Sequence, residues 1–405
     1  MSLSTAKDMQ TVALLLKSIL LKGGFRLTKF YSNVQDAFTD IPKEDLSSIT
    51  VNLDRQQTEA QKALGVVWDS QSDNIRFKVS GWQGQITRRT ILSYVASLFD
   101  PLGLVAPVLL TAKRLLQELC RKKVDWDGEL ASEEIVAWQE WLHGLAGLTE
   151  LRIPRCIKPR TLEGPYQMEL HGFSDASEAG YGAAIYARLV ATDGSIYCSL
   201  VLGKSRVAPM RAVSIPRMEL TAAVLAAKLI SYVKEELLKG VKSVTLWTDS
   251  MIVLQLIRNT SSRFETFVAN RLSSIHDLSS PDDWRYVDTK RNPADLASRG
   301  MHPKDQRTRE WFSGPEFLWK DQVAWPVQPQ GFSDELTELK PKERTQVFTT
   351  LEGYSWFNCF SLSCSWGALL LTEVACLVTT RFLWLHKSFL CQTPSPYYFR
   401  RRFIR

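Results

Sequence analysis

The sequence lacks the features of a disulfide-rich, zinc-binding or exported protein. Its 405 residues include seven cysteines but no Cys-x-x-Cys pair, and the N-terminal MSLSTAKDMQ has no apolar signal-peptide core. We therefore expect reduced thiols and a cytosolic or nuclear setting. Charges and prolines interrupt each apolar run of the segment 87–119 before it reaches 18 residues, so we expect a helix-bundle core there and no membrane span.

The chain also has little excess charge and few histidines. A formal net charge of +7 permits binding to a polyanion without indicating it, whereas 45% hydrophobic residues allow sizeable cores in two or three domains. The spacing of His143, His171, His276 and His302 is not that of metal ligands. Only His302 follows an acidic candidate, Asp295, closely enough to enter a site beside it.

The segment 171–187, HGFSDASEAGYGAAIYA, gives the first signal of function. Its pattern predicts two strands joined by a turn at 178–180, with Asp175 at the end of the first strand. The neighbours of Asp175 are small, so its carboxylate is open to a large partner. A carboxylate on a rigid strand end suits a hard divalent cation. Taken alone, Asp followed by Ala-Ser is also typical of an ordinary turn.

More acidic residues follow at the ends of predicted elements. After the hairpin, the pattern predicts a strand, a helix, a strand, a helix, a short strand and a final helix, at 195–203, 214–238, 242–249, 250–258, 284–288 and 292–300. Glu219 lies in the first turn of the long helix, Asp249 ends the fourth strand, and Asp295 lies in the last helix. The predicted order is therefore βββαβαβα, with an acidic residue near four of the element ends.

The expected chain crossover brings two of these acids together. A right-handed connection through the long helix places the fourth strand parallel to the first, which makes Asp175 and Asp249 neighbours at the carboxyl ends of adjacent strands. Several carboxylates at one sheet edge repel one another unless cations hold them together. Two Mg²⁺ ions, which keep some of their waters and need few protein ligands, would resolve this conflict and support phosphodiester hydrolysis.

These segments together resemble the ribonuclease H domain of Bel/Pao LTR retrotransposon polyproteins. The resemblance is carried by GFSDAS at 172–177, SIPRMELTAA at 214–223, LWTDS at 246–250 and NPADLASRG at 292–300. It implies an α/β, ribonuclease H-like fold over 165–303, with a mixed five-stranded sheet in the order 3-2-1-4-5 and flanking helices. It also implies that the metal-binding and catalytic acids are Asp175, Glu219, Asp249 and Asp295.

The same resemblance divides the rest of the chain. It implies an end of a reverse transcriptase palm-like α+β segment over 1–85 and a helical thumb and connection region over 86–150. Within the first we expect a helix at 9–22, a strand at 24–30, and two strands between 62 and 79 joined by a polar turn at 70–74. Within the second we expect helices on both sides of a break at 100–103. Trp126, Trp138 and Trp141 are expected on a helical stretch as packing residues.

The C-terminal quarter of the chain, beyond the ribonuclease H segment, has a weaker pattern. We expect a linker over 304–350, rich in Trp and Pro at 311–329, which would lead toward an integrase in a longer polyprotein. A poorly defined apolar and basic tail follows over 351–405. The tail could be a single membrane span, but its longest apolar stretch is short for one, and we favour a poorly packed remnant.

Several motifs of related proteins are missing. A reverse transcriptase palm carries Tyr-x-Asp-Asp, but here Tyr286-Val287-Asp288 continues with Thr289, so we expect no DNA synthesis by this chain alone. Bel/Pao sequences are also catalogued as a retroviral-type peptidase family. The Asp-Thr-Gly or Asp-Ser-Gly loop of that chemistry is absent, because Asp249-Ser250 continues with Met251. The chain resembles a fragment that starts downstream of the palm, or a decayed copy.

Recognition of the nucleic acid is harder to locate. The polar residues near the inferred acids are candidate substrate contacts; they are Ser177, Ser214, Arg217 and Ser250. They would contact the 2′-hydroxyl groups and backbone of a hybrid duplex, although capping and turn roles fit these residue types equally well. Lys204, Arg206 and Arg211 are either a solvated loop or phosphate contacts.

Two classes of function stay open. In the first, a ribonuclease H uses two Mg²⁺ ions, with Mn²⁺ as an alternative, to cleave the RNA strand of an RNA–DNA hybrid and leave a 3′-hydroxyl. In the second, an inactive or domesticated remnant binds nucleic acid without turnover. Expected partners are the hybrid or another nucleic acid and the remaining retrotransposon polyprotein, with no clear membrane partner.

Overall fold

The computed structural model describes residues 6–30, 32, 38–46, 61–63, 66–69, 72–98, 100–159, 161–237, 240–259, 264–302, 305 and 307–329. The predicted tail at 351–405 and the second part of the predicted linker lie outside the described residues. No helix of the described ranges combines the length and apolar character that a membrane crossing requires.

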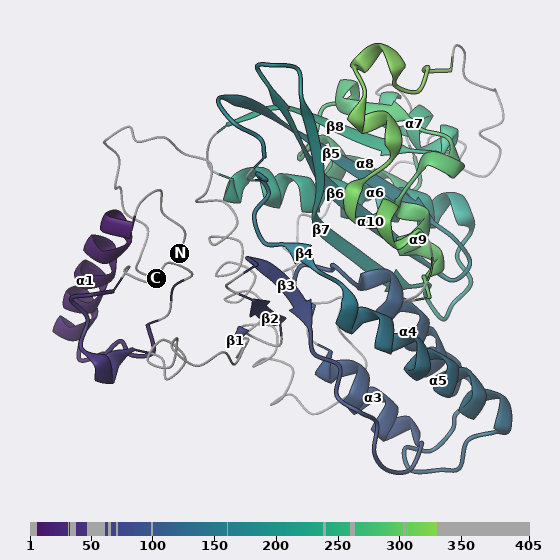
Figure 1. The fold of residues 1–405 in the computed structure, drawn as a ribbon. Coiled ribbons are helices and arrows are strands. Elements are labelled where there is room, and N and C mark those ends of the chain that lie inside the picture. Colours follow the sequence, from purple (N-terminus) through teal and green to yellow (C-terminus); the bar gives the residue numbers. More distant parts are fainter. Residues whose placement is uncertain are drawn as a thin grey trace.

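A mixed five-stranded sheet forms the centre of the fold (Figure 1). Its strands are β5 (Tyr166–Ala176), β6 (Gly180–Ala191), β7 (Ile196–Val207), β8 (Val241–Thr248) and β9 (Trp284–Tyr286). They lie in the order β7-β6-β5-β8-β9, with antiparallel pairing from β5 to β7 and parallel pairing of β5 with β8 and of β8 with β9. This arrangement confirms the predicted strand order 3-2-1-4-5 and the α/β class.

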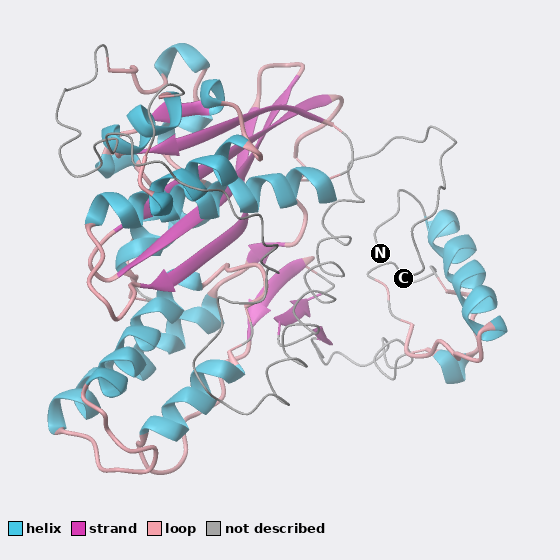
Figure 2. Ribbon diagram, turned by 180° about the vertical axis from the view of Figure 1, so that it is seen from behind, coloured by secondary structure: helices cyan, strands magenta, loops and turns pink. Residues whose placement is uncertain are grey.

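Helices cover both faces of this sheet (Figures 1 and 2). They are α6 (Ile215–Glu236), α7 (Met251–Arg258), α8 (Thr266–His276) and α9 (Ala294–Arg299). The alanines of α6 allow a close approach to β5, where a Cβ added at Gly172 would lie 3.2 Å from the Cδ1 of Ile230. On the opposite face, a Cβ at Gly182 would lie 2.5 Å from the Cβ of Ala297 in α9. Glycine therefore sets the helix-to-sheet distance on each face.

The predicted pair of helices around 100–103 is present and belongs to the same hydrophobic core. The helical region consists of α3 (Arg88–Ser97), α4 (Ala106–Arg121) and α5 (Ser132–Leu145). The carboxylate of Asp100 accepts hydrogen bonds from the amides of Leu104 and Val105, both 2.8 Å long, which orders the turn before α4. The α4 helix packs against β7 and α9, where the backbones of Gly103 and Gly203 meet.

The three tryptophans of this region divide into two groups. Trp138 and Trp141 of α5 are buried and stack with ring centroids 4.8 Å apart, as expected for packing residues. Trp126 differs from the prediction, because it lies in the loop before α5 and is 36% exposed. The guanidinium carbon of Arg88 lies 4.1 Å from the centroid of its ring. A cation and not a hydrophobic core therefore covers this indole.

The N-terminal part contains one confirmed helix and one wrong strand. Helix α1 (Ala6–Lys22) agrees with the helix expected at 9–22. The residues expected as a strand at 24–30 form only an isolated bridge from Phe30 to Leu46. Lys29 has a φ of 62°, which interrupts an extended run because a strand requires negative φ throughout.

A smaller four-stranded sheet follows. It consists of β1 (Gln61–Ala63), β2 (Val66–Asp69), β3 (Asn74–Phe77) and β4 (Ile153–Pro154), in that order. The antiparallel pair of β2 and β3 confirms the two strands predicted between 62 and 79. Strand β4 comes from beyond α5 and pairs with β3, so the chain segments before and after the helical region share one sheet.

The region expected to be a linker packs on the large sheet. It forms α10 (Thr308–Ser313) and two short 3-10 helices, η5 (Glu316–Trp319) and η6 (Gln322–Ala324). The indole of Trp311 is fully buried and donates a 2.8 Å hydrogen bond to the carbonyl of Leu104, and the hydroxyl of Tyr186 donates one of 2.8 Å to the carbonyl of Trp311. Its Trp-rich composition suggested a connecting segment, but these rings complete the hydrophobic core.

Candidate active site

Two of the predicted acids are neighbours at one edge of the large sheet. Strands β5 and β8 run parallel with Ser174 opposite Thr248, so the next residues, Asp175 and Asp249, stand side by side at the carboxyl ends of both strands. Asp175 is 5% exposed. The crossover argument thus predicted this juxtaposition correctly, and it sets the position of the candidate site.

Glu219 approaches the same edge from α6. The helix begins at Ile215, with Pro216 in its first turn, so Glu219 lies at the start of the second turn and not in the first as predicted. The hydroxyl of Ser250 donates a 2.6 Å hydrogen bond to Oε2 of Glu219. Because Ser250 directly follows Asp249, this hydrogen bond holds Glu219 beside the end of β8.

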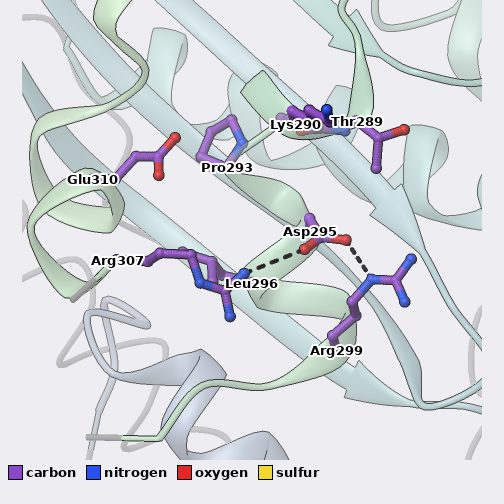
Figure 3. A pocket seen from close by; sticks show the side chains of 9 residues that line it. Thr289, Lys290, Pro293, Asp295, Leu296, Arg299, Arg307 and Glu310 are labelled. Carbon is purple, nitrogen blue, oxygen red and sulfur yellow. Dashed lines mark hydrogen bonds and ion pairs between the residues drawn. The ribbon is translucent and has the colours of Figure 1, made fainter. Parts of the chain in front are cut away.

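Asp295 completes the group from α9. The loop before this helix is fixed to β5, because the side-chain amide of the buried Asn292 donates a 3.0 Å hydrogen bond to the carbonyl of Ser174. The carboxylate of Asp295 forms an ion pair with Arg299 and lies 3.7 Å from Nη1 of Arg307 (Figure 3). The fourth predicted acid therefore belongs to the same edge, but two arginines already face it.

The acids influence one another electrostatically. Burial, followed by the negative charges of Asp249 and Asp295, raises the pKa of Asp175 to about 7, although the Ser298 hydroxyl opposes this shift. Burial also raises the pKa of Asp249 against the effect of Thr289, which donates a 2.7 Å hydrogen bond to its Oδ2. The pKa of Glu219 is raised by burial and by Asp249. The chain thus holds carboxylates in a place where their ionised forms are mutually unfavourable.

The donor set fits a hard divalent cation. All four side chains offer carboxylate oxygens, which Mg²⁺ prefers, and Oδ1 of Asp249 is buried without a hydrogen-bond partner among the described residues. Within the described ranges, however, no three His, Cys, Asp or Glu side chains already converge closely enough to hold an ion. Instead, Ser298, Ser250, Thr289 and Arg299 each hold one of the acids.

The residues predicted to bind substrate have structural contacts. The hydroxyl of Ser177 donates a 2.9 Å hydrogen bond to the carbonyl of Ser298, and Ser250 caps α7 through the amide of Val253 as well as contacting Glu219. Arg217 forms a 3.0 Å ion pair with Glu265. Ser214 is the N-cap residue of α6, without a side-chain capping bond. Contact of these four residues with nucleic acid stays a prediction.

The basic residues before α6 are placed differently from the expectation. Lys204 and Arg206 lie on β7 and not in a loop, whereas Arg211 is exposed after that strand. Burial and the positive charges of Lys204 and Arg206 lower the pKa of Lys113 in α4. Lys113 of α4 and Lys204 and Arg206 of β7 are therefore a group of basic residues from two distant parts of the chain.

Sequence reasoning missed several partners of the acids. Ser298 donates a hydrogen bond to Asp175, and Arg299 pairs with Asp295 at the i,i+4 spacing that helices allow. Both lie within NPADLASRG, so the motif held a signal for them. Arg307 lies seven residues after the end of this motif, and no local pattern links it to Asp295. His302, which was considered for the site, is exposed.

A pocket opens beside Asp295 (Figure 3). It has a volume of about 390 Å³. The residues that line it come from the loop before α9, from α9 and from the start of α10, and they are Thr289, Lys290, Asn292, Pro293, Asp295, Leu296, Arg299, Arg307 and Glu310. Three of these side chains are cationic and two are anionic, so the pocket offers both a carboxylate for a cation and guanidinium groups for an anion.

Comparison with known proteins supports the family resemblance. Residues 87–250 match the model of the Pao retrotransposon-like RNaseH-like domain, which confirms the resemblance to Bel/Pao elements. A search of curated proteins gives no match. The matched residues include the helices α3 to α5 and the strands of the large sheet from β5 to β8, and they end at Ser250.

Three solved structures of ribonuclease H domains are similar to part of the chain. The N-terminal RNase H domain of rv2228c from Mycobacterium tuberculosis is 12% identical, with a TM-score of 0.24 over 32% of this chain and 95% of that one. RNase H1 from Halobacterium salinarum is 14% identical, with a TM-score of 0.21 over 32% and 93%. LC11-RNase H1, isolated from compost by a metagenomic approach, is 13% identical, with a TM-score of 0.22 over 36% and 92%. Our assignment of the fold rests on the strand order and the family model.

Proposed function

We propose that this chain, which carries a Pao retrotransposon-like RNaseH-like domain, is a ribonuclease H that hydrolyses the RNA strand of RNA–DNA hybrids. Asp175, Glu219, Asp249 and Asp295 would hold two Mg²⁺ ions. The observation that supports this most strongly is the meeting of Asp175 and Asp249 at the ends of β5 and β8, with no cationic side chain paired to either in the described part of the chain. Such a pair of carboxylates is stabilised by divalent cations.

Each acid has a neighbour that fixes its orientation. Ser298 holds the carboxylate of Asp175, Ser250 that of Glu219 and Thr289 that of Asp249. These hydroxyl donors are neutral, so they orient the oxygens while leaving the negative charge uncompensated. Two bound Mg²⁺ ions would supply the Lewis acidity that phosphodiester hydrolysis needs. The proposed substrate would lie across the open carboxyl ends of β5 and β8, where ligands of such sheets bind.

Binding without turnover is the second candidate function. It is favoured by the absence, within the described residues, of three acids that already converge on one point, and by the ion pair between Asp295 and Arg299. In this case the basic groups on β7 and α9 would bind the phosphate backbone, and cleavage would not follow. The peptidase alternative gains no support, because the matching family model describes a ribonuclease H-like domain.

Cleavage of a labelled hybrid by the purified chain tests the proposal. We expect Mg²⁺-dependent cleavage of the RNA strand, and a loss of at least about 100-fold in Asp249→Asn, since removing even an outer partner of a metal ligand costs 10–100-fold. Asp282→Asn, at an acid of the short helix before β9, is the matched control and should cleave like the wild type.

Two results would contradict the proposal. The first is tight, salt-sensitive binding of the hybrid by the wild type with no cleavage, which would support the binding candidate. The second is equal cleavage by the wild type and Asp249→Asn, which would place the activity elsewhere.

A further inference from the structure

Arg299 is a cation in direct contact with the acidic edge. Its Nε pairs with Oδ1 of Asp295 one helical turn earlier, and Asp295 is 17% exposed whereas the Arg299 side chain is 60% exposed. Asp295 raises the pKa of Arg299, and Asp175 and Asp249 contribute to the same shift. The negative charges of three of the four acids therefore act on the guanidinium group. The same side chain lines the pocket (Figure 3).

We propose that Arg299 is a phosphate-binding residue gated by the divalent cation. In the free chain Asp295 holds Arg299; when a cation takes over Asp295, the guanidinium group is released into the adjoining pocket and binds a backbone phosphate of the nucleic acid. The inference rests on the proposed function, because it requires Asp295 to be a metal ligand. It adds the consequence that metal and nucleic acid strengthen each other's binding.

The geometry favours release of Arg299 over release of Arg307. Nη1 of Arg307 lies 3.7 Å from Asp295, but its Nη2 forms a 3.0 Å ion pair with Asp305, which would retain it. Within the described residues Arg299 forms an ion pair with Asp295 alone, and an i,i+4 pair whose arginine is largely exposed contributes little stability. Exchange of this partner for a phosphate is therefore easy, and the planar guanidinium can contact two phosphate oxygens at once.

The pocket has room for this exchange. Its volume is about 390 Å³, and its lining includes Arg299 itself as well as Thr289 and Lys290 of the loop before α9 and Glu310 of α10, so a guanidinium that leaves Asp295 lies next to open space. Lys290 also lines the pocket and adds positive charge. A simpler role for Arg299 is to stabilise the short helix α9 through its ion pair with Asp295. That role predicts no dependence on metal, which separates the two explanations.

The test is the salt dependence of hybrid binding, measured by fluorescence anisotropy with the full chain. The probe is a DNA strand paired with 2′-O-methyl RNA, which resists cleavage, in Mg²⁺ or in EDTA. Each phosphate contact contributes about 0.9 to the slope of log affinity against log salt concentration. We expect Arg299→Gln to lower the magnitude of this slope by about 0.9 in Mg²⁺. In EDTA the slope should not change, because the wild-type Arg299 stays paired with Asp295 and makes no phosphate contact.

Arg121→Gln is the matched control, because Arg121 is also an exposed arginine paired with an acid of its own helix, Glu118, in α4. Its slope should equal that of the wild type under both conditions. Equal slopes for the wild type and Arg299→Gln in Mg²⁺ would overturn the inference, and so would the same reduction in Mg²⁺ and in EDTA.

Failure of the proposed function gives a different result from failure of this inference. If the wild type does not cleave an unmodified hybrid, the ribonuclease assignment fails, whereas a slope difference that appears only in Mg²⁺ still supports gating of Arg299. If the wild type cleaves and the slope difference is absent or independent of Mg²⁺, the ribonuclease assignment stands and the gating of Arg299 is wrong.

Discussion

The two ends of strand β5 hold buried carboxylates in opposite electrostatic situations. Glu169 and Asp175 lie six residues apart, so both side chains face the same side of the sheet. Nη1 of Arg188 donates a 2.7 Å hydrogen bond to Glu169, and the His171 imidazole and this guanidinium lower the pKa of Glu169 to about 2 against the effect of burial. The carboxylate of Asp175 has a serine hydroxyl and two neighbouring acids, and its pKa is raised to about 7.

The difference separates an acid with a structural partner from an acid that we propose binds a cation. Arg188 is 3% exposed and also donates hydrogen bonds to the carbonyls of Leu318 and Lys320. The charge of Glu169 is therefore compensated within the chain, and the same guanidinium group holds the segment at 318–320 against the sheet. At the other end, burial and like charges act on Asp175, and no cationic side chain forms an ion pair with it in the described part of the chain. A buried carboxylate that lacks its counter-charge marks the place where the molecule needs a partner from outside.

Removal of the guanidinium at the paired end should have the largest effect on stability. Arg188→Met leaves Glu169 charged and buried and leaves two carbonyls unpaired, so we expect the free energy of unfolding to fall by about 3–5 kcal/mol. Chemical denaturation with a fluorescence readout measures this change. Arg121→Met, which removes an exposed arginine, should cost about 0–1 kcal/mol.

The double variant Glu169→Leu/Arg188→Met sharpens this test. Removal of both charges leaves no unpaired ion in the core, so the double variant should be more stable than Arg188→Met alone. If the free energy of unfolding of the double variant falls by the sum of the two single-variant losses, Glu169 and Arg188 do not act as a pair.

Acidification should remove the contribution of the paired end to the free energy of unfolding. Asp175 acts in the opposite direction, because its pKa is raised from 3.8 to about 7, so its contribution favours the folded chain as the pH falls below 7. The folded pKa of Glu169 is about 2 against an ordinary value of 4.5, so its contribution is present above pH 4.5 and is lost as the pH falls toward 2; the full shift corresponds to on the order of 3 kcal/mol. Burial lowers the pKa of His171 below 6.5, so the unfolded chain takes up this proton first and stability begins to fall below pH 6.5. Denaturation between pH 8 and 3 measures both steps.

Two variants assign these steps. His171→Asn keeps an acceptor near the indole of Trp247, which donates a 3.3 Å hydrogen bond to Nδ1 of His171, and should remove the loss that begins below pH 6.5. Glu169→Gln should remove the loss below pH 4.5. If the pH profile of either variant matches that of the wild type, the titration belongs to another group.

The sequence was sufficient for the large sheet and for the meeting of two acids. Alternating apolar residues and the turn at 178–180 predicted the hairpin, and the handedness of the crossover was enough to place Asp175 beside Asp249. These features depend on local pattern and on a topological rule that has few exceptions. The predicted start of the long helix at 214 also agrees with α6, but Glu219 is the fifth residue of the observed helix and therefore lies in its second turn, not in the first.

Other features depended on packing that no local pattern records. Trp311 follows Leu104 by more than 200 residues, and only the folded core shows that the two form a hydrogen bond. The approach of Arg307 to Asp295 likewise depends on how α10 packs against the sheet. The prediction of a strand at 24–30 was wrong for a different reason. Lys29 has a positive φ, and a lysine gives no sign of this conformation in the sequence, whereas a glycine or an asparagine would have indicated it.

The most direct test of the unpaired end compares the stability of the wild type and Asp175→Asn with and without Mg²⁺. In EDTA we expect Asp175→Asn to be at least as stable as the wild type, because the amide can still accept from Ser298 and no longer repels Asp249. At a hundred times its Kd, Mg²⁺ should stabilise the wild type by about 2.7 kcal/mol and the variant by much less. Equal stabilisation of both proteins by Mg²⁺, or a variant that is clearly less stable in EDTA, would contradict a shared cation site at this edge of the sheet.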